Sequence, residues 1–399
     1  MSQVWPKFFQ EFSRYLPLTS VIWKSPFSSK PAKTIDSILI DFKPFSNDLF
    51  TRKTVLTSHL LPSCHLFIVS CDDSETYKTI IRKQIKDWLE MVNRKKVQEC
   101  VIIHVCSQEQ PKITKFSVNL KSSVYDKIKS DFGSKTNRCC QIPLADNDPS
   151  DWYDLLMKLK DAVITSFSLI ITSIDEEIRK MDSLRLNPGW NYGSFFLVKE
   201  SMALVYESIG LQEEALEQYE ELEAIFYHVH GPGTSTVAFN NFGASEVGDE
   251  VGNILDFSQK PYRDFILQNN ISIFDFRIYL FARQAYLLNS MGKIALIYDK
   301  GRILISTLFK NQVYCYFNVK NSEIAQQWKF NACRKILYRF SEYEAGNPEE
   351  ASNLAIARVE LIIFLRKLVI KFLIQDSNCS CSIRKSIHYR IQFYYWHHK

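Results

Sequence analysis

The stretch that decides the fold is LVKESMALVYESIGLQEEALEQYEELEAIF at residues 197–226, which has the pattern of two helices joined by a short turn. Small side chains let two antiparallel helices approach closely, and aromatic side chains fill the space between them. A glycine in the turn readily takes the left-handed conformation that ends a helix. The residues at these positions are Ala203, Tyr206, Gly210, Ala215 and Tyr219. The pattern predicts a hairpin that packs or binds and performs no chemistry.

The spacing of these small and aromatic residues resembles that of a tetratricopeptide-type repeat. The alternative is an ordinary helical hairpin inside a larger α domain, because a lone repeat cannot bury its own apolar face. Residues 273–291 echo the hairpin, with Ala285, Leu288 and Gly292 at matching offsets. The echo is partial, since the next small residue, Ala295, comes two positions too soon.

The N-terminal part of the chain alternates between short β-branched runs and helical patterns, which favours an α/β layer. The predicted strands are 35–42, 66–70, 101–105 and 139–142, and the predicted helices are 75–96 and 122–132. The strands at 66–70 and 101–105 are nearly continuous apolar runs on either side of a helix. They therefore predict a parallel crossover unit.

Strand patterns mostly end at Pro149, and helical patterns follow at 151–186, 195–209, 212–228, 273–291, 322–343 and 349–373. The first two of these helices are separated by Asn187, Pro188 and Gly189, because the proline disfavours helical geometry at the residue before it and the glycine permits a turn. The predicted organisation is an α/β domain at 1–148, a helical region with the hairpin at 149–230, a glycine-rich loop at 231–256, a continued helical region at 257–376 and an irregular tail at 377–399.

The bulk composition bounds the class of protein. A chain of 399 residues is expected to hold two or three domains, and its 46% hydrophobic residues can fill their cores. The formal net charge of +5 is too small over this length to indicate a nucleic-acid surface. Ten cysteines without a C-x-x-C pair suggest a reducing compartment. Charged residues interrupt both the N-terminus and the apolar run at 359–374, so neither a signal peptide nor a membrane span is predicted.

Sequence motifs for phosphate binding, catalysis or metal binding are weak in this chain. The GPGTST run at 231–236 lacks the lysine of a phosphate-binding loop. Asp72 and Asp73 follow a strand, where catalytic carboxylates can sit, but capping of the next helix is the favoured interpretation. The cysteines and histidines on or near two strands lack the short spacing of zinc ligands and are expected to be core residues; they are Cys64, His65, Cys71, Cys100, His104 and Cys106. We therefore predict no catalytic, cofactor-binding or metal site.

Five segments, taken together and in order, resemble one family. They are ETYKTIIRKQIKDWLEMV, SSVYDKIKSDFGSKTNRC, RLNPGWNYGSFFLVKESMALVYE, EEALEQYEELEAIF and ISIFDFRIYLFARQAYLL, within residues 60–300. The family is subunit 10 of the TRAPP II (trafficking protein particle) vesicle-tethering complex, and the match is to its N-terminal portion. The Asn-Pro-Gly-Trp step that holds Gly189 and Trp190 and the glycine-rich loop are its most distinctive local marks.

The resemblance implies an α/β domain followed by an α-solenoid, and a non-catalytic scaffold subunit of a Golgi and endosomal tether. That tether supports guanine-nucleotide exchange on Rab GTPases, with the exchange chemistry carried by small core subunits. The implied partners are other TRAPP subunits and, indirectly, a Rab. The implied location is cytoplasmic, peripheral to trans-Golgi and endosomal membranes. Family members are far longer and continue into β-sandwich domains, which implies a fragment, a misspliced product or a shortened paralogue.

Two other function classes stay open on the residues alone. One is a nucleotide-binding enzyme or GTPase-like domain built on the α/β unit, and the other is a generic helical-repeat peptide-binding protein. Binding of nucleotide by the isolated protein would favour the first, and binding of exposed peptide termini in a groove would favour the second.

Overall fold

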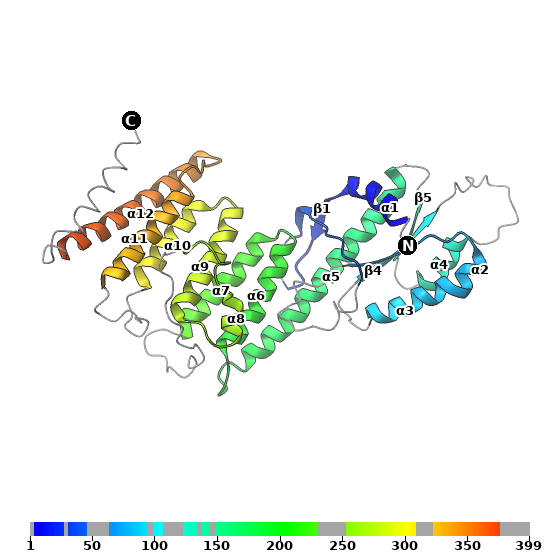
Figure 1. The fold of residues 1–399 in the computed structure, drawn as a ribbon, viewed down its shortest axis with the longest axis horizontal. Coiled ribbons are helices and arrows are strands. Elements are labelled where there is room, and N and C mark those ends of the chain that lie inside the picture. The colour runs from blue at the N-terminus through cyan, green and yellow to red at the C-terminus, as the bar shows by residue number, and fades with distance from the viewer. Residues whose placement is uncertain are drawn as a thin grey trace. The chain divides into compact units, whose positions relative to one another are not determined.

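A computed structural model describes residues 4–27, 31–45, 64–93, 99–106, 123–133, 138–143, 149–229, 253–308 and 322–375. The chain forms two compact units, of which the first holds residues 1–190 and 195–218 and the second holds residues 191–194 and 219–399. An α/β region comes first and a helical region follows, which confirms the predicted fold class (Figure 1). The predicted glycine-rich loop, except residues 253–256, and the predicted tail at 377–399 lie outside the described residues.

The first unit begins with the α/β elements. They are α1 (Val4–Phe12), a 3-10 turn (Ser13–Tyr15), β1 (Leu18–Trp23), β2 (Lys33–Ile38), β3 (Cys64–Val69), α2 (Ser74–Thr76), a π-helical turn (Tyr77–Ile81), α3 (Arg82–Asn93), β4 (Glu99–Cys106), α4 (Val124–Phe132) and β5 (Cys139–Pro143). The helices α5 (Pro149–Ser183), α6 (Tyr192–Ser208) and α7 (Gln212–Val229) follow. The division between the two units runs through α6 and α7.

A parallel sheet with the strand order β3-β4-β5 forms the centre of the first unit. The register pairs Leu66 with Val101 and Ile103 with Cys140, so the predicted parallel crossover is confirmed. The central strand β4 is buried along nearly its whole length, from Cys100 to Cys106. A strand covered on both faces has no solvent side, and this explains why its sequence is almost continuously apolar.

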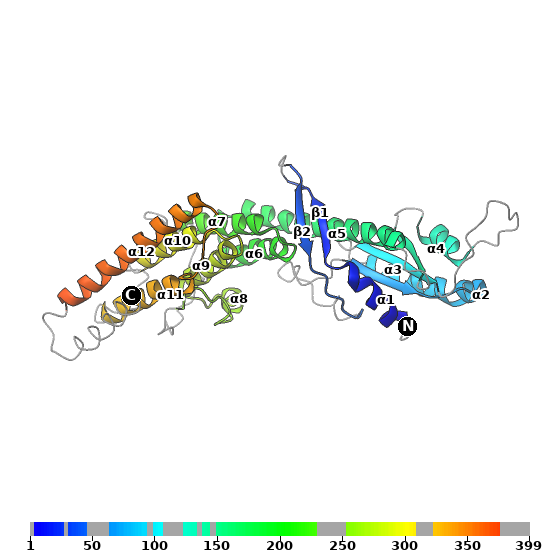
Figure 2. The same ribbon diagram turned by 90° about the horizontal axis from the view of Figure 1, so that it is seen from above.

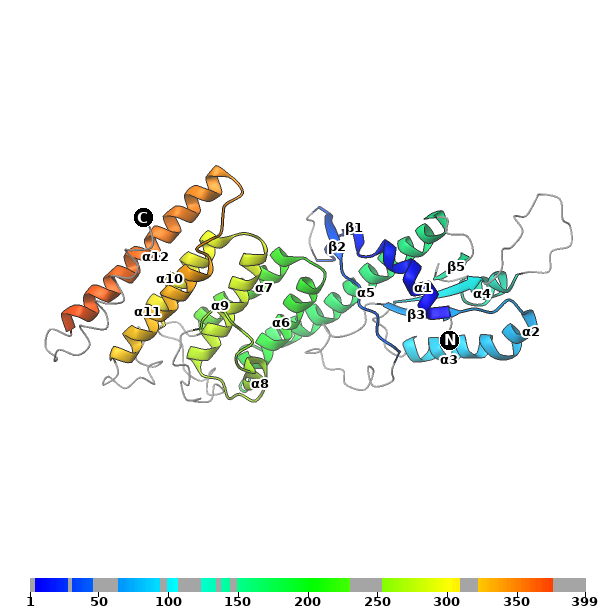
Figure 3. The same cartoon turned by 45° about the horizontal axis from the view of Figure 1, so that its top comes forward.

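Helices cover both faces of this sheet. On one face α3 buries Ile85, Trp88 and Val92, which recur at helical spacing, in a cluster with residues of α4 and the strands. On the other face α5 contacts all three strands. Figure 3 shows α3 and α5 on opposite sides of the strands. The first unit is therefore a helix, sheet and helix sandwich.

The strand predicted at 35–42 ends earlier in the structure, as β2 at Lys33–Ile38. It pairs in an antiparallel hairpin with β1, where Ile38 lies opposite Leu18. Pro17 immediately precedes Leu18 and has no backbone N–H to donate, so the ladder has no further partner beyond Ile38. Figure 2 shows this hairpin as two long arrows beside α5.

The second unit is a row of helices. After the part of α7 that begins at Tyr219, it holds α8 (Tyr262–Leu267), α9 (Ile273–Ser290), α10 (Ile294–Thr307), α11 (Ser322–Arg339) and α12 (Pro348–Gln375). Helix α10 packs against α9, α11 and α12, and α11 also packs against α12 (Figures 1 and 3). No described helix is both long and apolar enough to cross a membrane.

A second helical hairpin, α9 and α10, forms where the sequence echo was only partial. Gly292 takes a left-handed φ of +72° in the turn, and the backbone N–H of Lys293 donates to the carbonyl oxygen of Leu288. Gly301 is the small residue of α10 at which a neighbouring helix approaches closely. A Cβ at that position would lie 2.5 Å from Cδ1 of Ile336, so glycine lets α11 approach α10 closely.

Candidate functional site

The hairpin residues predicted from the sequence occupy buried positions. In the first unit Ala203 and Ala215 are both fully buried, and Gly210 has a left-handed φ of +86°. The ring of Tyr206 lies 5.9 Å from that of Trp23 and 6.0 Å from that of Phe167, measured between centroids. Tyr206 therefore holds α6 against β1 and α5, in addition to any filling of the hairpin itself.

Tyr219 belongs to the second unit and is also fully buried. Its hydroxyl accepts a hydrogen bond of 2.9 Å from Nε of Arg283 on α9. Gly189, with a φ of +88°, lies in the turn after α5. There, Nε1 of Trp190 donates to the carbonyl oxygen of Met181 at 3.0 Å. The positions singled out from the sequence therefore have packing and turn-forming contacts.

Asp73, the carboxylate at the end of β3, caps a helix. Its Oδ2 accepts hydrogen bonds from the backbone N–H of Thr76 at 2.7 Å and from the Thr76 hydroxyl at 2.6 Å. These hydrogen bonds hold the pKa of Asp73 below its ordinary value. The geometry is that of an N-cap, as the favoured interpretation of the sequence expected.

Asp73→Ala should lower the melting temperature of the protein at pH 7, because the helix that follows β3 loses its cap. Since the folded pKa of Asp73 lies below 3.8, the stabilisation from its charged form is present above that pH. It is lost as the pH falls through the folded pKa. The difference in melting temperature between wild type and variant should therefore shrink as the pH is lowered below about 4. Thermal melts followed by circular dichroism test this, with Asp87→Ala, an exposed acid in the middle of α3, as the control.

The cysteines and histidines near the sheet are packed, not gathered as ligands. Nε2 of the buried His104 lies 2.9 Å from the carbonyl oxygen of Cys71. Burial raises the pKa of the Cys139 thiol to about 11, which keeps this thiol protonated at neutral pH. In the described ranges no group of three or more His, Cys, Asp or Glu side chains is placed to hold a metal ion.

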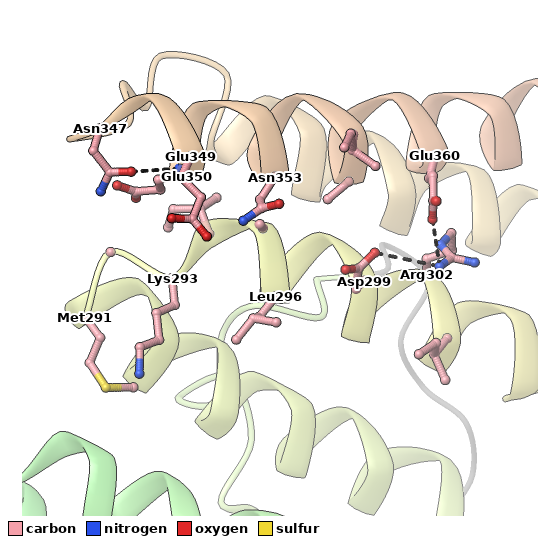
Figure 4. A pocket seen from close by; sticks show the side chains of 16 residues that line it. Met291, Lys293, Leu296, Asp299, Arg302, Asn347, Glu349, Glu350, Asn353 and Glu360 are labelled. Carbon is pink, nitrogen blue, oxygen red and sulfur yellow. Dashed lines mark hydrogen bonds and ion pairs between the residues drawn. The ribbon is translucent and has the colours of Figure 1, made fainter.

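An open groove of about 740 Å³ lies in the second unit, between α10 and α12 (Figure 4). Residues 294–303 of α10 form one wall, and residues 349–360 of α12 form the other. The turn at Gly292 closes one end, where the Tyr343 hydroxyl lies 2.9 Å from the Gly292 carbonyl oxygen and 2.8 Å from Oε1 of Glu350. The Glu350 carboxylate accepts a further hydrogen bond from the backbone N–H of Gly346. These contacts make the turn and the start of α12 one connected structure.

The groove combines apolar walls with an acidic rim. Leu296, Ile303 and Ile356 line it and are 46%, 52% and 57% exposed. Its ionisable residues are Lys293, Asp299, Arg302, Glu349, Glu350 and Glu360, an excess of two negative charges. Nη2 of Arg302 bridges the two walls, 2.9 Å from Oε2 of Glu360 on α12. Such a surface matches an amphipathic segment that carries basic side chains.

Sequence reasoning missed this groove. It missed α10, because Ala295 does not fall at the expected offset and Gly301 interrupts the helical pattern. It also passed over two arginines, Arg277 and Arg283, that are buried in α9. A signal for them existed, since both stand inside the otherwise apolar run FDFRIYLFARQAYLL.

Stacked helical hairpins are typical of proteins that bind other proteins over extended surfaces. Residues 1–185 match the family described as "Trafficking protein particle complex subunit 10-like, N-terminal". The chain belongs to the subunit 10 family through this N-terminal portion, which confirms the resemblance found in the sequence.

Curated relatives extend the match into the helices. Trafficking protein particle complex subunit 10 of Dictyostelium discoideum is 34% identical over 333 residues, which cover 73% of this chain and 22% of the relative. The trafficking protein particle complex II-specific subunit 130 homolog of Arabidopsis thaliana is 27% identical, with 69% and 21% covered. Subunit 10 of Homo sapiens is 25% identical, with 82% and 26% covered. The matched stretch thus spans about a fifth to a quarter of the length of these relatives.

Proposed function

We propose that this chain is a non-catalytic scaffold subunit of a TRAPP II-like vesicle-tethering complex. The observation that carries the proposal is the family match of residues 1–185, together with relatives whose names make them subunits of such a complex. The geometry agrees with it. Asp73 serves as a helix cap and the cysteines near the sheet are packed, while α10 and α12 leave an exposed groove.

The groove between α10 and α12 is the surface we assign to a partner subunit. Its occupant is an amphipathic helix with basic side chains, because apolar residues line the groove and the rim carries an excess of carboxylates. Leu296 and Ile356 are the apolar anchors. They come from opposite walls, so a helix lying in the groove would bury both at once.

The proposed role in Rab activation and its membrane location rest on the family resemblance. We propose that the chain supports, without performing, guanine-nucleotide exchange on a Rab GTPase in Golgi and endosome traffic. It would reach those membranes from the cytoplasm, peripherally, through the assembled complex. The α/β region, with helices on both faces of its sheet, would supply a further surface of the scaffold.

Affinity purification of the tagged chain from cells should recover TRAPP core subunits, identified by mass spectrometry. A double substitution, Leu296→Asp with Ile356→Asp, should lower that recovery by about tenfold or more. It places two carboxylates at positions that the bound partner would bury, in a groove that is already acidic. The matched control is Leu267→Asp with Tyr338→Asp. These residues belong to the same unit, are 56% and 78% exposed and lie outside the groove.

A second bait joins this chain to the remaining length of the Dictyostelium relative. If neither bait recovers core subunits, the proposed function is wrong. If wild type recovers them and the groove variant recovers the same amount, the scaffold role stands and the groove is not the docking surface. Circular dichroism of the purified variants establishes that each one is folded.

A further inference from the structure

Arg277 on α9 is a buried cation. Only 6% of its surface is exposed, and no carboxylate of the described residues lies within ion-pair distance of it. Its Nη2 donates to the Tyr227 hydroxyl at 2.9 Å and to Oγ1 of Thr307 at 2.7 Å. Its Nε is buried and has no hydrogen-bond partner. The guanidinium charge is therefore not compensated by a carboxylate of the described residues, and its buried Nε donor has no acceptor.

This situation is costly for a folded protein. Removing an ion from water carries a penalty of several kcal/mol that only a counter-charge and a full set of hydrogen bonds offset. Two neutral hydroxyls supply hydrogen bonds, and the Tyr227 ring lies at a cation–π distance of 5.5 Å from the guanidinium carbon, but neither supplies a negative charge. An anion that comes from outside the chain and enters beside Arg277 would supply the missing negative charge.

Arg283, six residues further along the same helix, shows how a buried arginine is accommodated by the protein itself. It is 4% exposed, and its Nε donates to the Tyr219 hydroxyl at 2.9 Å. Its guanidinium carbon lies 4.5 Å from the centre of the Phe257 ring, a cation–π distance. Nε of Arg283 is thus satisfied within the fold, and Nε of Arg277 is not.

Arg277 lines a pocket of about 190 Å³ between α7, α9 and α10. The apolar lining comes from Phe226, Leu280, Phe281, Ile303 and Leu304. The pocket also contains Lys300 and Glu223, but Nζ of Lys300 already lies 3.4 Å from Oε2 of Glu223 and 3.3 Å from Oε1 of Glu220. The charge of Lys300 is therefore compensated, which leaves Arg277 as the cation available to a ligand.

From this arrangement we propose that the pocket binds a carboxylate carried on a short apolar chain, with Arg277 as the anion-binding residue. The apolar walls disfavour a fully hydrated anion such as free phosphate, because they offer it no further donors. Drug-sized ligands and long acyl chains need pockets of about 300 Å³ or more. A pocket of this size accepts about one residue, so the natural source is an acidic side chain or a carboxyl terminus of a bound polypeptide.

The probe for the test is hexanoate, with hexanamide as the neutral molecule of the same shape and inorganic phosphate as the polar anion. Binding to the full chain is measured by ligand-observed NMR titration and by the shift in melting temperature. Hexanoate should bind wild type at least about tenfold more tightly than hexanamide or phosphate does, since hexanamide carries no charge and phosphate has no apolar chain to fill the pocket. A peptide ending in leucine, compared with its amidated form, distinguishes a carboxyl terminus from an acidic side chain as the source.

Arg277→Met should weaken hexanoate binding by about tenfold or more, and the variant should melt at or above the wild-type temperature because a buried uncompensated charge is gone. Arg283→Met is the matched control. It should melt at a lower temperature, because it removes the hydrogen bond that Arg283 donates to the Tyr219 hydroxyl, and should bind hexanoate with wild-type affinity below that temperature. Equal affinity of wild type for hexanoate and hexanamide, or unchanged hexanoate affinity in Arg277→Met, would overturn the proposal. The comparison of ligands on wild type decides the matter even if Arg277→Met does not fold.

Discussion

Trp152→Ala is expected to lower the free energy of unfolding of the first unit by about 3 to 5 kcal/mol, the range for removing a large aromatic side chain from a core. Trp152 lies near the start of α5 and is only 1% exposed. Its ring lies 5.5 Å from Phe8, 5.9 Å from Phe12 and 5.4 Å from Tyr15, measured between centroids. The substitution leaves a cavity among three rings that the short N-terminal helix cannot close by itself.

Urea unfolding followed by circular dichroism, with hydrogen exchange of the α5 amides, measures this loss in the unit concerned. The neighbouring substitution Tyr153→Ala is the control, because Tyr153 is 65% exposed, and its cost should stay within about 0.5 kcal/mol. Equal costs for the two variants would mean that α1 does not pack on Trp152. The N-terminal residues would then contribute nothing to the core of this unit.

Ala203→Leu and Ala215→Leu should each destabilise the protein by about 1 to 3 kcal/mol through overpacking. Both alanines have no exposed surface. Extra side-chain atoms at either position must push the two helices of the hairpin apart or force strained rotamers. Helix propensity cannot account for a loss of this size, because leucine is nearly as good a helix former as alanine.

The matched control for these alanines is Ala355→Leu, at an exposed position of α12, where a change within about 0.5 kcal/mol is expected. Thermal melts and urea titrations of the three variants provide the comparison. Wild-type midpoints for both hairpin variants would show that the small residues do not set a close helix approach. The repeat interpretation of residues 197–226 would then be wrong.

The best predicted elements are those whose local pattern and final environment agree. The strand at β4 was found because a strand buried on both faces has to be continuously apolar, and the helix at α3 because its buried face recurs at helical spacing. Strand β1 was missed. Its alternation of buried and exposed residues is broken where Thr19 and Ser20 are both exposed, and it acquires its pairing only when β2 returns beside it. Strand pairing is a long-range property that a local pattern of this length does not reveal.

The predicted site residues illustrate the same limit. Local sterics single out Ala203 and Gly210, because close helix approach and a left-handed backbone disfavour most other side chains. In the structure Ala203 is fully buried and Gly210 has a positive φ. The hydrogen-bond donor to the Tyr219 hydroxyl could not be predicted from local sterics. Its hydrogen bond comes from Arg283, more than sixty residues further along the chain.

The amino-acid sequence by itself determined the β3, α3 and β4 crossover, the change from an α/β region to helices, and the membership of residues 1–185 in their family. These features depend on periodicity and on side chains that act within one or two helical turns. Only the tertiary structure decided where the groove of α10 and α12 lies and that Arg277 is buried without a counter-charge. The physical reason is that burial and charge compensation depend on which distant side chains come together in space, and this depends on the packing of whole helices.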